Sequence, residues 1–361
     1  MYFRKPLLRW YYRLVKNKLK EWFFLSDEDI PSFGLTSLFD DENPEGAGDM
    51  EGFLETENLE EYETLEFGAH EPEMEILPSI QRNAAQVKDP SRIVPAPIVV
   101  VVNIAGKPAR ALIDTGSLCD FMSNSFANQL ELEKQKLQEP ITVQLAVLGS
   151  KSEVKFRTEA PISYQEVRET REFDIINLTS YDIILGTPFL FQHKCIVGFN
   201  PARVIIRSKE SLPTRGASIK PAGSRKSVRT VPNAIVATVK IAGKPARALI
   251  DTGSLCDFMS TTLADQLKVK KEELATSLMV NLAVQGPRTK VNYKTNVEFE
   301  YEDINGRRDF DLINLSNYDL ILGTLFLYQH KVMLSFNETQ IAIESAKALP
   351  IKGVAVKTLE S

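Results

Sequence analysis

The chain has 361 residues, of which 43% are hydrophobic and 25% are charged, and its formal net charge is −5. These values are ordinary for globular protein of two or three domains, and the negative charge speaks against a specific nucleic-acid partner. Three cysteines without a CxxC pair, and three histidines without metal-ligand spacing, predict no disulfide framework, no metal site and no cofactor. We therefore expect an intracellular protein of a reducing compartment, most simply the cytoplasm.

The N-terminal residues 1–25 form a basic amphipathic segment with seven Lys or Arg among aromatic residues and leucines. Charges at Arg9, Arg13 and Lys16 interrupt the apolar centre that a secretory signal requires. The longest apolar stretch elsewhere begins at Ile98 and is too short to cross a bilayer. We expect neither a signal peptide nor a transmembrane helix. A solvated helix is favoured over contact with an anionic membrane, the acidic stretch that follows or another protein.

Residues 26–97 are predicted to be an acidic, mostly disordered region. Between Ser26 and Ile80 there are eighteen Asp or Glu and no Lys or Arg. Such self-repulsion, with only scattered Phe and Leu, does not favour collapse into a core.

A repeat occupies the rest of the chain. Val102–Asn200 align with Val239–Asn337 at a constant offset of 137 residues and without a gap. A period this long indicates a duplicated domain rather than a solenoid. The Ser-, Pro- and Gly-rich residues between the copies read as a flexible linker. We divide this part of the chain into lobe 1 (98–208), a linker (209–233), lobe 2 (234–345) and a tail (346–361).

Each copy, about 110 residues long, reads as a small all-β domain. Two strands around an Ala-Gly-Lys-Pro turn lead to the segment ALIDTGSLCDFMS, which both copies contain. A short helix begins near Ser123 or Asn124, and its counterpart begins near Ser260 or Thr261. A hairpin turns at Gly149, or at Gly286 in the second copy. A further strand pair leads to YDIILGTPFL or YDLILGTLFL.

The DTG triplet is the strongest candidate for a functional site. A lone DTG is usually a turn, but here Ala-Leu-Ile precedes each aspartate. A carboxylate at the end of a buried strand costs desolvation free energy unless something pairs with it or uses it. The glycine that follows lets another backbone or a substrate come close. This context predicts sites at Asp114 and Asp251.

The order of motifs in each copy, apolar-DTG, glycine-tipped hairpin and then Ile-Leu-Gly, resembles the retropepsin-like aspartic proteases. The closest likeness is to the protease segment of gypsy-type retrotransposon polyproteins, and it covers both lobes. The resemblance implies two closed, mainly antiparallel barrels with one short helix each, paired as in pepsin. It further implies an aspartic endopeptidase that hydrolyses a peptide or polyprotein substrate.

The resemblance also implies roles for particular residues. Asp114 and Asp251 would form the catalytic dyad and share one proton, because two adjacent carboxylates do not both ionise cheaply. Ile184–Gly186 and Ile321–Gly323 would pack beneath the catalytic loops. The residues supporting the catalytic loops would be Thr115, Gly116, Ser117, Thr252, Gly253 and Ser254. Those of the flaps and the substrate groove would be Gly149, Gly286, Leu118, Cys119, Leu255 and Cys256.

Other polar residues recur at the same offset, and we predict structural roles for most of them. Cys119 and Cys256 read as small buried side chains rather than redox groups. Asp120 and Asp257 are predicted to cap the following helix rather than bind a peptide backbone. The hydroxyls of Ser117 and Ser254 are predicted to donate hydrogen bonds to the catalytic carboxylates. We expect exposed histidines at 193 and 330, solvent-facing aspartates at 174 and 311, and strand-start aspartates at 182 and 319.

Two alternatives remain open at this stage. A catalytically silent β-fold module for binding or dimerisation would have the same fold without requiring either aspartate. Each lobe could also pair with the same lobe of another chain, giving a homodimer. The 25-residue linker spans about 85 Å when extended and about 27 Å as a coil, so both lobes can meet within one chain. Tethering at roughly millimolar effective concentration favours that single-chain pairing.

Overall fold

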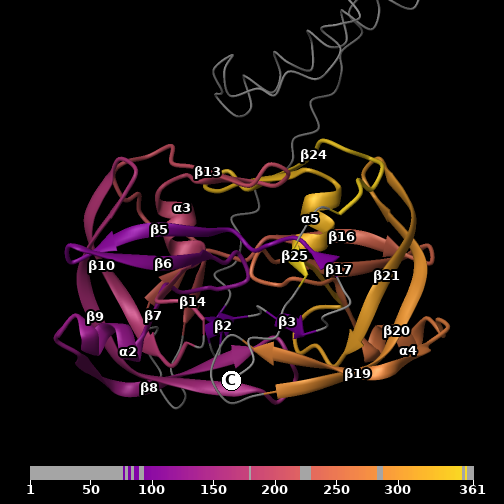
Figure 1. The fold of residues 1–361 in the computed structure, drawn as a ribbon, viewed down its shortest axis with the longest axis horizontal. Helices are drawn as coiled ribbons and strands as arrows, with labels where there is room; N and C mark the ends of the chain where they lie inside the picture. The colour runs from indigo at the N-terminus through magenta and orange to yellow at the C-terminus, as the bar shows by residue number, and fades with distance from the viewer. Residues whose placement is uncertain are drawn as a thin grey trace, which may run out of the picture. The chain divides into compact units, whose positions relative to one another are not determined.

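The structure is a computed structural model that describes residues 76–77, 80–82, 85–88, 93–178, 180–219, 229–282, 288–351 and 354–355. The predicted basic segment 1–25 and most of the predicted disordered region lie outside these residues. The two copies of the repeat form two lobes (Figure 1). None of the helices in the described part of the chain has the length and apolarity needed to cross a membrane.

Lobe 1 is a closed barrel. Among the described strands, six are paired in the order β10-β7-β11-β6-β5-β9, and β9 pairs back with β10 to close the ring. All neighbours are antiparallel except β7 with β10 and β6 with β11, which are parallel. A further strand, β8, pairs with the long β9 to form a hairpin. The strands are β5 (Val99–Ile104), β6 (Lys107–Ile113), β7 (Phe121–Ser123), β8 (Gln135–Leu145), β9 (Lys151–Tyr164), β10 (Val167–Ile176) and β11 (Ile183–Leu185).

Lobe 2 repeats this barrel. The order is β16-β17-β22-β18-β21-β20, and β20 pairs back with β16. The predicted all-β fold, with two closed and mainly antiparallel barrels, is therefore confirmed. The strands are β16 (Val236–Ile241), β17 (Lys244–Ile250), β18 (Phe258–Ser260), β19 (Glu272–Leu282), β20 (Arg288–Tyr301), β21 (Ile304–Ile313) and β22 (Leu320–Leu322).

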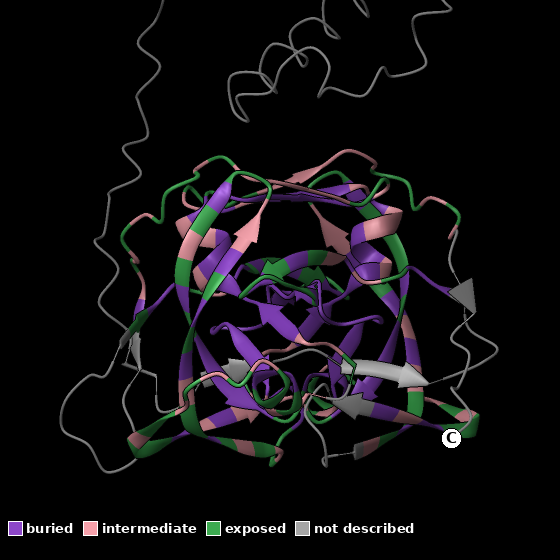
Figure 2. Cartoon of the chain, turned by 60° about the vertical axis from the view of Figure 1, so that its left-hand side comes forward, coloured by how far each residue is buried: buried purple, intermediate pink, exposed green. Residues whose placement is uncertain are grey.

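The strands follow from alternating apolar residues, and the first hairpin from its turn. In β16 buried and exposed residues alternate along the whole strand, as expected when one face meets a core. The turn between β5 and β6 places Ala105 and Gly106 at positive φ, 48° and 81°, the backbone of a tight two-residue hairpin. Figure 2 shows the buried residues at the centre and the exposed ones on the outer strands and loops.

Each lobe has two short helices among its described residues, whereas one was predicted. The predicted helices are α2 (Asn124–Gln129) and α4 (Thr261–Gln266). The hydroxyl of Ser260 accepts the Leu263 N–H at 3.0 Å and caps α4. The additional helices are α3 (Thr187–Gln192) and α5 (Thr324–Gln329), which begin directly after the Ile-Leu-Gly motifs. Their N-cap residues are Gly186 and Gly323, so the Ser, Thr or Asn start signal that marks α2 and α4 in the sequence is missing.

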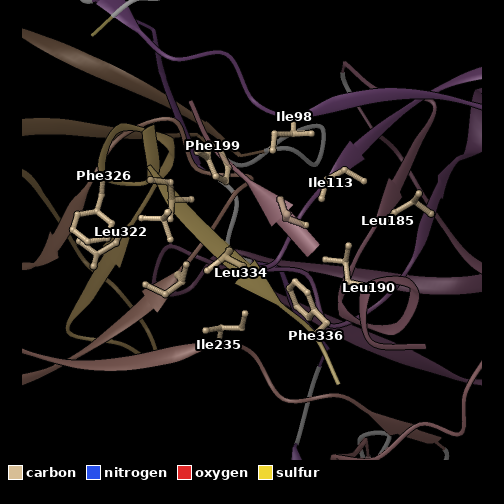
Figure 3. Close-up of a cluster of buried hydrophobic side chains, with 14 of the residues drawn as sticks. Ile98, Ile113, Leu185, Leu190, Phe199, Ile235, Leu322, Phe326, Leu334 and Phe336 are labelled. Carbon is tan, nitrogen blue, oxygen red and sulfur yellow. The ribbon is translucent and has the colours of Figure 1, made fainter. Parts of the chain in front are cut away.

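A four-stranded sheet and a continuous apolar core join the lobes. Its strands run in the order β13-β12-β23-β24, and the central pair β12–β23 crosses from one lobe to the other. One cluster of buried residues includes both barrel interiors; Figure 3 shows part of it, with Ile113 and Leu190 from lobe 1 and Leu322 and Phe326 from lobe 2. The strands of this sheet are β12 (Ile196–Gly198), β13 (Arg203–Ile205), β23 (Val332–Ser335) and β24 (Gln340–Ile343).

Short strands also occur outside the predicted lobes. β15, just before lobe 2, pairs with β14, just after lobe 1, while β4 before lobe 1 pairs with β25 in the tail. The described parts of the predicted linker, tail and disordered region are thus partly extended and paired. The segment before lobe 1 contributes three more strands. These outer strands are β1 (Ile76–Leu77), β2 (Ile80–Arg82), β3 (Ala85–Lys88), β4 (Ile93–Val94), β14 (Ala217–Ile219), β15 (Arg229–Val231) and β25 (Val354–Ala355).

Candidate active site

The two aspartates follow directly after the last residues of β6 and β17. The backbone N–H of Asp114 donates to the Leu185 carbonyl at 3.0 Å, and that of Asp251 donates to the Leu322 carbonyl at 3.0 Å. The parallel pairs β6–β11 and β17–β22 therefore fix where each DTG loop begins. Both aspartates are fully buried, although each is an ionisable group.

The two DTG loops meet each other. A Cβ atom added at Gly116 would lie 2.6 Å from Cγ of Asp251, so only glycine lets the lobe 1 loop approach the carboxyl of lobe 2 so closely. Within its own loop, the Gly116 N–H donates to Oδ1 of Asp114 at 3.0 Å. The Gly253 N–H donates to Oδ1 of Asp251 at 2.8 Å. The fold thus brings the two predicted sites together.

The electrostatics of this pair favour one shared proton. The pKa of Asp251 is raised to about 8, first by burial and then by the adjacent charge of Asp114, while hydrogen bonds from Ser254 and Gly253 act to lower it. One carboxyl of the pair therefore stays protonated at pH values at which an exposed aspartate is ionised. An acid and a base can then coexist at neighbouring positions.

Two threonines lock the loops across the lobe boundary. Oγ1 of Thr115 donates to the Ile250 carbonyl at 2.7 Å and accepts the Thr252 N–H at 3.0 Å. Reciprocally, Oγ1 of Thr252 donates to the Ile113 carbonyl at 2.6 Å and accepts the Thr115 N–H at 3.1 Å. Both threonines are fully buried. All four bonds cross from one lobe to the other, which is the arrangement that the resemblance implied.

The Ile-Leu-Gly motifs lie against the DTG loops. A Cβ atom at Gly186 would lie 2.4 Å from the Cys119 carbonyl oxygen and 2.5 Å from that of Ser117. Gly323 makes the same close approach in lobe 2. The following N–H group, that of Thr187, donates to the Ser117 carbonyl at 2.8 Å. Glycine is thus required by backbone packing, and the predicted support of the catalytic loops is present.

The serines of the two loops differ. Oγ of Ser254 donates to Oδ2 of Asp251 at 2.8 Å, as predicted. Oγ of Ser117 instead donates to the carbonyl of Cys119 at 2.8 Å. The prediction for Ser117 is therefore wrong, because its hydroxyl donates to a backbone carbonyl of its own loop. The two carboxyl groups have different hydrogen-bonding environments despite identical loop sequences.

The hairpin of β8 and β9 in lobe 1 has its tip against lobe 2. Gly149 has φ +82° in its turn, a conformation that favours glycine. The N–H of Leu148 donates to the Asn314 carbonyl of lobe 2 at 2.8 Å, and Val147 forms a bridge with Leu315. This hairpin tip thus reaches across to the other lobe. Gly286, at the tip of the corresponding hairpin of β19 and β20, lies outside the described residues.

The residues after each DTGS are buried beside the loops. Leu118, Cys119, Leu255 and Cys256 all belong to one apolar cluster that also contains Val147 of the hairpin tip. Cys119 lines a cavity of about 410 Å³ in lobe 1, and Cys256 lines one of about 260 Å³ in lobe 2. All three cysteines are buried, as expected of small core side chains.

A buried ion pair, which was not predicted from the sequence, holds the end of the DTG loop in each lobe. Oδ2 of Asp120 accepts a bond from Nη1 of Arg171 at 2.5 Å, and its Oδ1 accepts the Gly186 N–H at 2.7 Å. In lobe 2 the partner of Asp257 is Arg308, whose Nε lies 2.8 Å from Oδ2. Burial raises the pKa of both aspartates, while the guanidinium groups act to lower it. The aspartates thus bind the start of α3 and α5. The prediction that they cap the helix that follows them in the sequence, α2 or α4, is wrong.

Several predicted surface residues are buried instead. His193 is fully buried; its Nδ1 lies 2.8 Å from the Ser208 carbonyl and its Nε2 lies 3.1 Å from Oε1 of Glu169. His330 makes the same contact with the Ser345 carbonyl. The aspartates at 174 and 311 are also buried, because their strand β10 or β21 has β7 or β18 on one side. The aspartates at 182 and 319 lie just before β11 and β22 and accept the N–H groups of Arg110 and Arg247 at 2.8 Å.

Comparison with protein-family models agrees with this geometry. Residues 110–213 match the model described as PEG10/RTL1 protease domain, and residues 217–349 match the model described as retroviral aspartyl protease. The chain is a tandem duplication of a retropepsin-like aspartic protease domain. Among curated proteins, no relative matches the chain. In this retropepsin-like protein both copies retain the whole DTG loop, and the fold brings the copies together within one molecule.

Proposed function

We propose that the chain is an aspartic endopeptidase whose catalytic dyad is Asp114 and Asp251. The observation that carries the proposal is the meeting of the two DTG loops, with Gly116 against the carboxyl group of Asp251 and four hydrogen bonds between the threonines. A silent module would require neither the buried carboxyl pair nor the close glycine contact.

The chemistry would use the shared proton. The ionised carboxyl takes a proton from a water molecule, whose oxygen attacks the peptide carbonyl carbon. The protonated carboxyl donates its proton to the developing oxyanion. When the carbonyl reforms, the dyad takes that proton back and donates a proton to the leaving amine nitrogen. The hairpin tip that reaches lobe 2 at Asn314 would exclude bulk water from the peptide.

The substrate class is a peptide in extended conformation. The hairpins of both lobes have strand edges that can add an extended chain by backbone hydrogen bonds. The proposal includes a retrotransposon origin, supported by the motifs and the match to the PEG10/RTL1 protease domain. The proposal also includes a location in the reducing cytoplasm, in keeping with three buried cysteines that form no disulfide within the described residues.

Comparison of single and mixed variants tests the dyad. We expect wild type to cleave a peptide library in a manner blocked by a statine-type inhibitor, and Asp114→Asn and Asp251→Asn each to lose at least about a thousandfold in kcat/KM. A mixture of the two variants should stay inactive. Restored activity on mixing would indicate lobes exchanged between chains. Activity surviving in either single variant, or absence of cleavage by the folded wild type, would refute the internal dyad.

A further inference from the structure

One short stretch of the chain adds a strand to both lobes. β2 (Ile80–Arg82) pairs with β8 of lobe 1, and β3 (Ala85–Lys88) pairs with β19 of lobe 2. Each is the edge strand of its sheet. β8 and β19 are the first strands of the hairpins that flank the candidate site. In Figure 1, β2 and β3 follow one another between these hairpins and the middle of the molecule.

The strand directions are those of a peptide lying across a two-fold axis. β8 and β19 are equivalent strands, 137 residues apart, and they approach from opposite lobes. A single extended peptide that crosses between two such strands must run parallel to one and antiparallel to the other. β2 is parallel to β8 and β3 is antiparallel to β19, as this requires. The segment therefore lies where an extended substrate would pair with both hairpins.

The register identifies the centre of this segment. Ile80 lies opposite Val143, and Val87 lies opposite Val280, which is the repeat equivalent of Val143. The midpoint of this pair is the bond between residues 83 and 84. These two residues lie outside the described part, and the midpoint follows from their neighbours. The other pairs have the same midpoint: Gln81 opposite Gln144 with Gln86 opposite Asn281, and Arg82 opposite Leu145 with Ala85 opposite Leu282.

The same pseudo-two-fold relation connects the two aspartates. Asp114 and Asp251 are also separated by the repeat offset, and their loops meet across the lobe boundary. The axis that relates the hairpins thus passes between the carboxyl groups as well as through the middle of the segment. A peptide bond at that midpoint is the one that a symmetric dyad would attack.

We propose that residues 80–82 and 85–88 occupy the peptide groove of their own chain and block it against other peptides. The segment is joined to lobe 1 by a short connection, so its effective concentration at the groove is about millimolar or higher. The further statement that the dyad can remove the block rests on the proposed function. Hydrolysis of the 83–84 bond adds the hydroxyl of one water to the Asn83 carbonyl carbon and its remaining proton to the Ala84 nitrogen. The products are residues 1–83 and 84–361.

Occupancy can be tested without catalysis by amide hydrogen exchange on the full chain carrying Asp114→Asn. Residues 80–88 and the paired hairpin amides at 279–282 should be protected. Adding Gln86→Pro together with Val87→Pro removes two adjacent N–H donors, one of which must lie in the ladder. We expect this variant to exchange at least about tenfold faster in both segments. Ser91→Pro, beyond the end of β3, is the matched control and should change neither segment.

A second measurement connects occupancy with activity. In the wild-type background the double proline variant should show an apparent KM about tenfold lower for an added peptide, with kcat unchanged, because the internal competitor is weakened. The kinetic comparison uses freshly prepared, uncleaved chains; after prolonged incubation, mass spectrometry of the wild type should find cleavage after residue 83. Equal exchange of residues 80–88 in the parent and the proline variant would overturn the occupancy, whether or not the chain is a protease. Cleavage elsewhere within 80–88 would overturn the register.

Discussion

The hydrogen bonds between Thr115 and Thr252 allow a sharp test of lobe pairing. Thr252→Val keeps the shape of the side chain but removes its bonds to the Thr115 N–H and the Ile113 carbonyl, at 3.1 and 2.6 Å. Both groups are buried in the lobe boundary, and each loses its partner. An unsatisfied buried polar group costs about 1–3 kcal/mol, so we expect a loss of roughly 3 kcal/mol in the free energy of unfolding.

Thr295→Val is a matched control within lobe 2. Thr295 is equally buried, but its hydroxyl donates to the Lys270 carbonyl at 2.8 Å inside the lobe. This variant should lose about 1 kcal/mol, because a single hydrogen bond is removed. Its peptidase activity should be unchanged, since the DTG loops are untouched.

Urea denaturation measures stability and peptide hydrolysis measures the site. Without urea, where both variants remain folded, we expect Thr252→Val to lower kcat/KM at least about tenfold. Thr295→Val should leave kcat/KM unchanged. Thr252→Ser, which keeps the hydroxyl, should recover most of the activity. Equal effects of the two valine substitutions on both measurements would refute the view that the threonine bonds align the catalytic loops.

The remaining predictions concern the glycine contact, the buried ion pair and the shared proton. Gly116→Ala should abolish activity and destabilise the paired lobes, since its Cβ would lie 2.6 Å from Asp251, whereas Gly149→Ala, with open space around its Cβ, should cost only about 1 kcal/mol of backbone strain; normal activity of Gly116→Ala would contradict the close approach. Arg308→Met should cost about 3 kcal/mol in urea denaturation, because it leaves the buried Asp257 carboxylate without its partner; a stability equal to wild type would show that the pair is dispensable. The raised pKa of Asp251 predicts that activity and the stability contributed by the shared proton are present at acid pH and lost as pH rises through that raised value. Activity and the free energy of unfolding, each measured as a function of pH, should both fall as pH rises through this pKa. An activity that keeps rising above this pKa would refute the assignment.

The repeat made the central part of the site predictable from sequence. Identical thirteen-residue segments after apolar strands indicated Asp114 and Asp251 as buried carboxyls, and alternation predicted the barrel strands. Equivalence between copies then implied a two-fold arrangement. These features depend on local patterns that repeat, and such patterns are visible in the sequence.

The buried polar residues outside the DTG loops were not predictable in the same way. Arg171 lies on a strand that also carries the exposed Arg168 and Glu172, and only the fold reveals that Asp120 faces it. His193 belongs to the polar stretch FQHK, yet its ring packs 4.8 Å from that of Phe189 at the end of α3. One signal was available: both residues recur 137 positions later, as Arg308 and His330. The recurrence of both an arginine and a histidine at the repeat offset could have indicated that they form a buried network.

The strands before lobe 1 could not be found by hydrophobic pattern at all. β2 and β3 pair with the hairpins through backbone groups, which any non-proline residue supplies, so their sequence need not alternate. The composition of residues 26–97 is dominated by the acidic residues of its first part. The prediction of disorder therefore extended to residue 97 and included the residues that form β1 to β4. Pairing of this kind depends on a free strand edge elsewhere in the fold.

The two copies share the contacts that cross the boundary between the lobes, and they differ in some contacts within each lobe. The threonine bonds that cross the boundary are present in both directions, and Gly186 and Gly323 make the same close approach to the DTG loop of their own lobe. Some contacts confined to one lobe differ: Glu169, which binds His193 and Arg171, corresponds to Gly306 in lobe 2. A bond across the boundary joins one copy to the other, so a change in either copy breaks it, whereas an internal contact can change alone. A single chain can therefore keep a symmetric pair of DTG loops while each lobe, and the hydrogen bonding of each aspartate, differs.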